Sequence, residues 1–188
     1  RTARLFTWTH YDIIEYDLTG AIQLPEPPPI PGLEAFVLET YADMADIVTR
    51  GYDDFRMLDP GYDMSFTRDL VAFAVYVDRR LAHIGWVASS PEGKAVLDAL
   101  PYEADFAHGQ AVTGGAFTAR PFRGLGIHRY VVRLKFHYLK QHGWTSCRSS
   151  VGVGNIASQR THRPLGGRRV CSGRYIRFPG LQRWNVRV

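Results

Sequence analysis

The chain has no acidic side chain after Asp105. All 18 Asp and Glu residues lie in the first 105 positions with only eight Lys and Arg, and the other 15 basic residues follow. Such a division usually marks two surfaces with different partners, unless the two halves pair across the fold. The sequence leaves both interpretations open: internal pairing, or a basic surface for a polyanion opposite an acidic surface for a cation.

Other absences narrow the class of protein. No apolar run reaches the roughly 18 residues that span a bilayer, and the first residues lack the apolar segment of a signal peptide. We therefore expect a soluble, cytoplasmic protein without a membrane partner. The chain has no Lys/Arg tract and no recognised nucleic-acid motif, which argues against nucleic-acid binding. Cys147 and Cys171 are too far apart for a metal-ligand pair, so we expect two reduced, packed thiols and no metal.

The overall composition is typical of a globular protein. The chain has 188 residues, of which 45% are hydrophobic and 13% aromatic, enough for one domain with a sizeable core. Residues 24–31 contain five prolines and predict an extended connector. We therefore divide the chain into an N-terminal appendage with its connector, residues 1–31, and a domain at residues 32–188. The appendage would pair with a second chain in a homodimer or cover an edge of its own sheet.

Hydrophobic spacing and turn residues predict a sheet of mixed direction in an α+β fold. The expected strands are 3–18, 34–39, 71–77, 81–88, 110–118, 144–153, 169–178 and 184–188. The expected helices are 41–53, 59–70, 91–100, 127–142 and 156–163, with Thr40 and Asn155 as N-caps of the first and last.

The most informative stretch runs from a strand through a glycine loop into a helix. Arg123-Gly-Leu-Gly126 follows the strand at 110–118 and directly precedes the helical pattern that begins at Ile127. The first N–H groups of a helix have no internal partner and the helix dipole favours an anion there, so such loops bind phosphate. The alternative is a glycine turn that binds nothing.

A second motif has a definite spacing relative to this loop. Asn155 opens a helix, Ser158 follows three positions later, His162 follows seven positions later, and Leu165-Gly-Gly167 ends the segment. Together with Arg123, Gly126 and His128 in the loop, these residues resemble the two signatures of the GNAT superfamily of N-acetyltransferases. Three positions depart from that family: His128 replaces a small residue, His162 a tyrosine, and Gly167 an aromatic residue.

The resemblance covers about residues 32–188 and implies a fold and a cofactor site. The fold is a mixed, mostly antiparallel central sheet flanked by helices, in which two parallel strands splay apart. These would be the strands that end near Thr118 and Gly154, and the pantetheine arm of acetyl-CoA or coenzyme A would lie between them. The implied cofactor-binding residues are Phe117, Thr118, Arg123, Gly124, Leu125, Gly126, Ile127, His128, Arg129, Asn155 and Ser158.

The resemblance also implies direct transfer of an acyl group, with acetyl-CoA as the expected donor, to a small amine that approaches over the acidic half. His162 would protonate the leaving thiolate, since an unperturbed pKa near 6.5 leaves it partly charged; the alternative is a histidine on the helix surface. Glu103 is the expected base through water, with Asp105 and His108 as alternatives. Two other functions remain open: transfer from an acyl carrier protein, which the basic half would suit, and a non-catalytic CoA-binding module.

Overall fold

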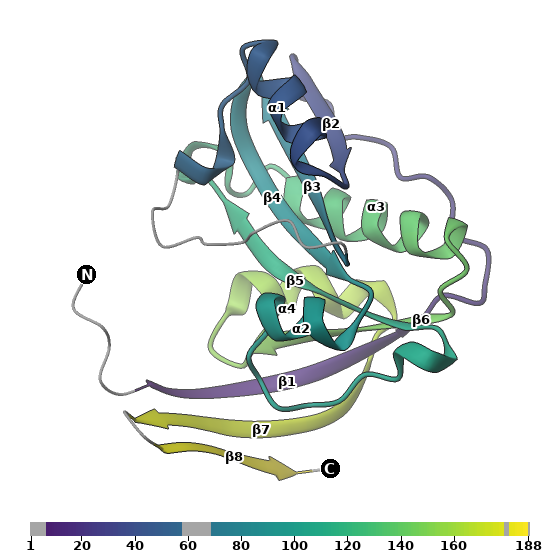
Figure 1. Ribbon diagram of the computed structural model, residues 1–188, viewed down its shortest axis with the longest axis vertical. Helices are drawn as coiled ribbons and strands as arrows, with labels where there is room; N and C mark the ends of the chain where they lie inside the picture. The colour runs from purple at the N-terminus through teal and green to yellow at the C-terminus, as the bar shows by residue number, and fades with distance from the viewer. Residues whose placement is uncertain (1–6, 58–68, 179–180, 188) are drawn as a thin grey trace.

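The computed structural model describes residues 7–57, 69–178 and 181–187, which form one eight-stranded sheet in the order β2-β3-β4-β5-β6-β1-β7-β8 (Figure 1). The strands are β1 (Thr7–Asp17), β2 (Leu33–Leu38), β3 (Leu70–Val77), β4 (Arg80–Ala88), β5 (Gln110–Thr118), β6 (Ser146–Gly152), β7 (Arg168–Phe178) and β8 (Leu181–Arg187). The helices are α1 (Tyr41–Thr49), α2 (Pro91–Leu97), α3 (Ile127–Gln141) and α4 (Ile156–His162). Only β5 and β6 are parallel within the described sheet. The predicted mixed, mostly antiparallel α+β fold is therefore confirmed.

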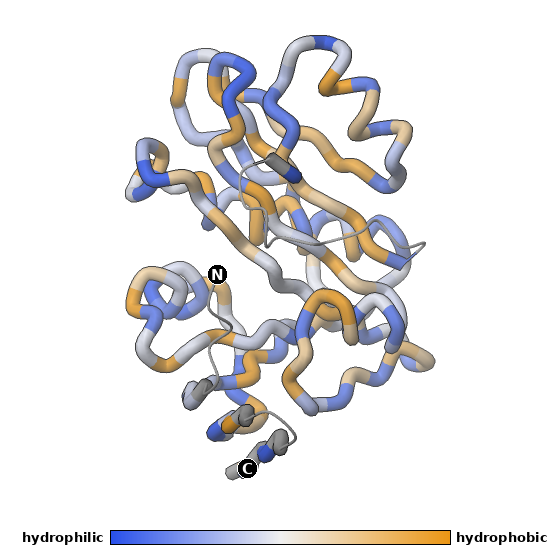
Figure 2. The backbone as a smooth tube through the Cα atoms, turned by 60° about the vertical axis from the view of Figure 1, so that its left-hand side comes forward, coloured by the Kyte–Doolittle hydropathy of each residue, from blue (hydrophilic) through white to orange (hydrophobic). Residues whose placement is uncertain are grey.

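Two hydrophobic cores lie on the two faces of the sheet. α1 and α2 cover one face, where Met44, Ile47 and Leu97 belong to the same hydrophobic cluster as Trp86 of β4. α3 covers the other face with Ile127, Val131, Val132, Phe136 and Leu139. Because β3 and β4 are buried on both faces, they read as continuous apolar runs. Figure 2 shows the hydrophobic stretches concentrated in the central strands and the hydrophilic ones in the outer turns.

The sheet opens between its only described parallel strands. The pairing of β5 with β6 runs from Gln110 opposite Ser146 to Thr113 opposite Ser149, while β5 continues to Thr118 and β6 to Gly152. Beyond Thr113 the register of β5 against β4 shifts, and Gly115 there has a φ of 58°. A left-handed backbone suits glycine because it has no Cβ. The expected splay of these two strands is thus confirmed (Figure 1).

The N-terminal strand corrects the expected division of the chain at residue 31. β1 lies inside the sheet, paired antiparallel with β6 on one side and with β7 on the other. It is therefore an integral strand, and the described edges are β2 and β8. The expected pairing of this segment with a second chain, or over an edge of its own sheet, does not hold for β1. A homodimer through another surface remains a prediction.

The predicted element types are confirmed, with small differences at the ends. α1 stops at Thr49 and α2 at Leu97, a few residues before the ends that the sequence predicts. Thr40 caps α1 in a reciprocal capping box with Asp43. The helix expected at 59–70 falls almost entirely outside the described residues. No described helix is long and apolar enough to cross a membrane.

The acidic and basic parts of the chain pair along β1, where Asp12 contacts Arg169 at 3.9 Å and Glu15 contacts two further arginines. Glu15 of β1 contacts Arg148 of β6 at 2.8 Å and Arg168 of β7 at 3.0 Å. The pKa of Glu15 is lowered: its burial acts in the opposite direction, and the hydrogen bonds from Arg148 and Gln110 outweigh it. Internal pairing thus accounts for part of the charge division. Cys147 and Cys171 are both free, as expected.

Candidate functional site

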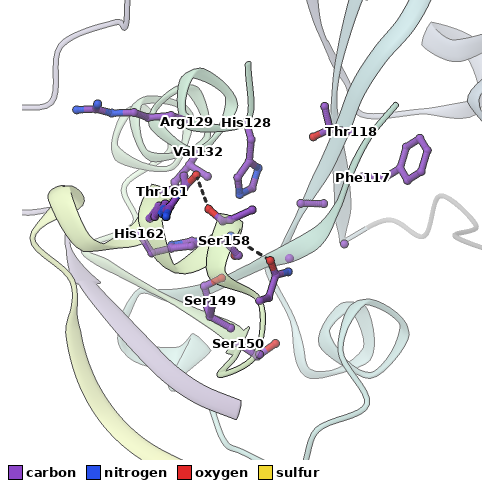
Figure 3. Close-up of a pocket in the computed structure, with 18 of the residues that line it drawn as sticks. Phe117, Thr118, His128, Arg129, Val132, Ser149, Ser150, Ser158, Thr161 and His162 are labelled. Carbon is purple, nitrogen blue, oxygen red and sulfur yellow. Dashed lines mark hydrogen bonds between the residues drawn. The ribbon is translucent and has the colours of Figure 1, made fainter. Parts of the chain in front are cut away.

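A cavity of about 830 Å³ occupies the gap between the splayed strands (Figure 3). Leu97 and Asp98 line it from the α2 face of the sheet. Val132 and Lys135 of α3 and His162 of α4 line it from the opposite face. The cavity therefore passes through the sheet and connects the two faces. It exists because β5 and β6 stop pairing after Thr113.

The glycine loop forms one rim of this cavity. A 3-10 turn at Arg120–Phe122 leads to Gly124 and Gly126, whose φ values are 78° and 81°. Gly126 is the N-cap of α3, and no side chain caps the helix there. A Cβ placed on either glycine would meet no atom within 4 Å, so the space above the loop is open. The loop thus offers an uncapped helix N-terminus to an anion.

The second motif builds the opposite wall. The Asn155 side chain accepts a hydrogen bond from the Ser158 N–H at 3.1 Å, which caps α4 as predicted. At the end of α4, His162 is buried with 5% of its surface exposed. Its Nδ1 is hydrogen-bonded to the hydroxyl of Tyr16 on β1. The alternative of a surface histidine is therefore wrong, and Nε2 is the ring nitrogen left for a ligand.

Gly167 explains how Tyr16 reaches His162. A Cβ on Gly167 would overlap the side chains of Ile14 and Tyr16. Tyr16 is 1% exposed and stacks at a tilt against Phe136 of α3, with ring centroids 4.7 Å apart. Tyr16 therefore packs directly against the position where the resemblance expects an aromatic side chain. Because residue 167 is a glycine rather than an aromatic residue, there is room for the tyrosine that β1 provides.

His128 and His162 line the cavity and His83 lies next to His128, and all three imidazoles are neutral at neutral pH. The ring of His128 lies 5.2 Å from that of His83 and 6.0 Å from that of His162. Burial lowers the pKa of His162 to about 4 and that of His128 to about 3, and it lowers the pKa of His83 well below its ordinary value. The expectation of a partly charged His162 is therefore wrong, because burial disfavours the imidazolium.

His128 and Arg129 point in different directions from the start of α3. Figure 3 shows the His128 ring directed toward the cavity, whereas the exposed Arg129 extends away from it. The Thr118 hydroxyl is hydrogen-bonded to His83 Nδ1 at 2.8 Å, and the Thr118 carbonyl accepts from Arg123 Nε at 3.0 Å. The ring of His128 thus lies inside the site, between the imidazoles of His83 and His162.

The structure brings most of the residues expected at the cofactor site to one cavity. The lining contains Phe117, Thr118, Arg123, Gly124, Gly126, Ile127, His128, Arg129, Asn155, Ser158 and His162. Leu125 is at the tip of the loop and 46% exposed, outside the lining.

The expected base lies outside the cavity. Glu103 is exposed, and its carbonyl accepts a hydrogen bond from Arg148 at 2.6 Å. Asp105 and His108 pair with each other at 2.8 Å, also outside the lining. These residues precede β5, whereas the splay begins beyond Thr113, so the length of the strand separates them from the gap. A residue that precedes the start of β5 in the sequence therefore lies at the opposite end of the strand from the gap.

Sequence reasoning missed three residues of this site. Lys135 has a signal, because it lies four positions after Val131 on the apolar stripe of α3 and is 2% exposed. Asp98 follows α2, and Tyr102 donates a hydrogen bond to it at 3.0 Å. Tyr16 belongs to β1. No local pattern identifies Asp98 or Tyr16, because their place in the site depends on distant strands. Within the described residues, no group of His, Cys, Asp and Glu could hold a metal ion.

No protein-family model and no curated protein sequence matches the chain. Several solved structures are similar to it. A GCN5-related N-acetyltransferase from Sphaerobacter thermophilus aligns over 91% of this chain and 51% of its own, with a TM-score of 0.58 and 12% identity. A GCN5-related N-acetyltransferase from Kribbella flavida aligns over 95% of this chain and 63% of its own, with a TM-score of 0.52 and 18% identity.

A third similar structure is the glucosamine N-acetyltransferase region of a fungal multi-domain β-N-acetylglucosaminidase. It aligns with 90% of this chain and 21% of its own, with a TM-score of 0.60 and 15% identity. This chain thus spans between 21% and 63% of the three proteins. At these identities the likeness shows the fold, and this chain has the fold of the GCN5-related N-acetyltransferases.

Proposed function

We propose that the chain is an acyl-CoA-dependent N-acyltransferase that transfers the acyl group to a small amine by direct attack. The observation that carries this proposal is the cavity that passes through the sheet between β5 and β6. A donor that enters beside α3 and α4 and an acceptor that enters beside α2 would meet in this gap.

The donor side offers what a CoA thioester needs. The uncapped N-terminus of α3 and the open loop at Gly124 and Gly126 suit a pyrophosphate. The exposed side chains of Arg123 and Arg160 lie at the cavity and add positive charge for the phosphates. The main chain of β5 beyond Thr113, including Phe117 and Thr118, is left without a β6 partner and suits the pantetheine amides. Acetyl-CoA is the simplest donor of this kind.

The acceptor side carries an acid. Asp98 is the only carboxylate in the described lining of the cavity, and it lies on the α2 face, opposite His128 and His162. A carboxylate here attracts an ammonium group and holds the amine near the gap after it loses a proton. The cavity is therefore polarised, with its acid on the acceptor side and its basic groups on the donor side.

The chemistry follows from the pairing of His162 with Tyr16. The amine nitrogen forms a C–N bond with the thioester carbon, the C–S bond breaks, and one proton must move from the nitrogen to the departing sulfur. A neutral imidazole suits both halves of that transfer, because Nε2 first accepts the proton and then donates it. A phenol hydroxyl both donates and accepts, so Tyr16 pairs with either tautomer of His162 and holds the ring in place.

Binding of the donor is the first test. Thermal unfolding is measured with CoA, acetyl-CoA and longer acyl-CoAs, because a ligand that binds only the folded state raises its stability. We expect a rise with each of them. Leu125→Asp puts a negative charge on the loop and should weaken CoA binding by about tenfold. Val186→Asp on β8, equally exposed at 45%, is the matched control and should bind as the unmodified protein does.

Turnover is the second test. Release of the free thiol of CoA is followed with a panel of small amines, and we expect a rate that depends on the amine. A rise in melting temperature without turnover on any amine would favour the non-catalytic CoA-binding module. No rise with any thioester would refute the CoA site. The basic rim would then favour an acyl carrier protein as donor, which a thioester carried on such a protein would test directly.

A further inference from the structure

A buried lysine lies on the donor side of the cavity. Lys135 is two turns after His128 on α3, faces the cavity, and has 2% of its surface exposed. A Cβ placed on Gly85 of β4 would lie 3.2 Å from Lys135 Nζ and 3.5 Å from His83 Nε2. The absence of a side chain at Gly85 therefore provides the space in which the ammonium and the imidazole face one another.

Lys135 has no counter-charge among the described residues. None of the ion pairs in this part of the chain includes it. The titratable groups around it are the imidazoles of His83, His128 and His162 and the thiol of Cys147. Burial lowers the pKa of Lys135 to about 8, which still leaves it mostly protonated at pH 7. The interior thus holds a positive charge without a carboxylate, which is costly unless a ligand supplies the anion.

Two more polar atoms beside Lys135 lack partners. Within the described chain, His83 Nε2 and His128 Nδ1 are buried without a hydrogen bond. The other ring nitrogen of His83 is held by Thr118, which fixes the orientation of the ring. When the Thr118 hydroxyl donates to Nδ1, Nε2 carries the proton and becomes a donor. Lys135, which lines the cavity, then has a second donor beside it in His83, which lies behind the lining and adds a polar group near a bound carboxylate.

The phosphates of CoA cannot supply this anion. Lys135 is nine residues after Gly126, about 14 Å along the helix axis at 1.5 Å per residue. A pyrophosphate at the loop is therefore out of reach of Nζ. The amine acceptor has the wrong charge, and it would enter from the side of Asp98.

We propose that the acyl group of the donor ends in a carboxylate, which Lys135 binds in the interior of the cavity, with His83 next to its ammonium group. The substrate class is a dicarboxylic acid joined to CoA through one carboxyl group, such as malonyl, succinyl or glutaryl thioesters. This inference rests on the proposed function, and the product would be an amide whose acyl part keeps a free carboxylate.

The test compares thioesters of the same length with and without the terminal charge. Dissociation constants of CoA, acetyl-CoA, butyryl-CoA and succinyl-CoA are measured by calorimetry on the unmodified protein. Succinyl-CoA should bind at least about tenfold more tightly than butyryl-CoA. Lys135→Met keeps the length of the side chain without its charge and should abolish that preference, with CoA affinity unchanged. Arg133→Met, an exposed position on the same helix, removes the same charge and should keep the preference.

The outcomes separate this inference from the function on which it rests. If no thioester binds, the CoA site itself is wrong. If CoA and acetyl-CoA bind but succinyl-CoA has no advantage over butyryl-CoA, or keeps it in Lys135→Met, the carboxylate site is wrong. Free succinate serves as a further ligand. If succinate binds only when Lys135 is present, but succinyl-CoA has no advantage over butyryl-CoA, then the carboxylate that Lys135 binds does not belong to the acyl group. The comparison on the unmodified protein stands even if the variant fails to fold.

Discussion

Replacing Lys135 by methionine should stabilise the protein at neutral pH. Burial moves the pKa of Lys135 from 10.5 to about 8. At about 1.4 kcal/mol per pKa unit, the difference corresponds to about 3 kcal/mol of the free energy of unfolding. Below pH 8 the side chain is charged in both states, and the folded state bears the whole cost of burying the charge. Above about pH 10.5 it is neutral in both states, and the cost disappears.

The sign of the pH dependence follows from the proton count. Between pH 8 and 10.5 the unfolded chain binds one more proton at Lys135 than the folded protein does, so the stability of the unmodified protein rises with pH. Lys135→Met lacks this rise. Its advantage should be about 3 kcal/mol at pH 7 and shrink steadily above pH 8.

Urea unfolding of both proteins at several pH values between 7 and 10 measures this difference. Other groups titrate in both proteins, so the comparison isolates Lys135, and Arg133→Met serves as the exposed control on the same helix. Parallel stability profiles at every pH, or a variant that is less stable at pH 7, would refute the reasoning. Either result would mean that the ammonium has a counter-charge that the described residues do not include.

Three further substitutions test the walls of the cavity. Tyr16→Phe leaves His162 Nδ1 buried without its partner and should lower the free energy of unfolding by about 1–3 kcal/mol; turnover should fall while CoA affinity, measured by calorimetry, stays the same. Gly167→Ala adds a methyl group that overlaps two side chains of β1, so it should cost about 1–3 kcal/mol in urea unfolding, whereas Gly154→Ala, where the space is open, should cost little. Asp98→Asn keeps the acceptor for the Tyr102 hydroxyl but loses the charge, and in steady-state assays it should raise KM for the amine by about tenfold without changing CoA binding.

The parts of the fold that the sequence predicts are those with local causes. The strand, loop and helix from Gln110 to Gln141 follow from apolar spacing and from two glycines with positive φ. The N-caps Thr40 and Asn155 mark the beginnings of α1 and α4 because their side chains bond to amides three residues later. Signals of this kind lie within a few residues of the structure that they specify.

The parts that the sequence does not predict depend on contacts between distant segments. The strand character of β1 is visible in its residues, but its place between β6 and β7 is not. The sequence therefore does not place Tyr16 beside His162, nor does it show which side chain packs against the glycine at position 167. Glu103 was expected near the site on sequence proximity alone. The prediction that His162 is partly charged is also wrong, because the side chain is buried only in the assembled fold.

The position of β1 in the sheet constrains the order in which the protein folds. Tyr11 pairs with Gly152 on one side and with Gly173 on the other, so this strand must wait for partners from the far end of the chain. The β3–β4 hairpin needs only its own turn and should form early, as local contacts close before distant ones. During synthesis, the apolar side chains of β1 stay without their partners until the ribosome has made β6 and β7. The cavity, whose His162 is hydrogen-bonded to Tyr16, is thus completed among the last steps, and a nascent chain released early would lack it altogether.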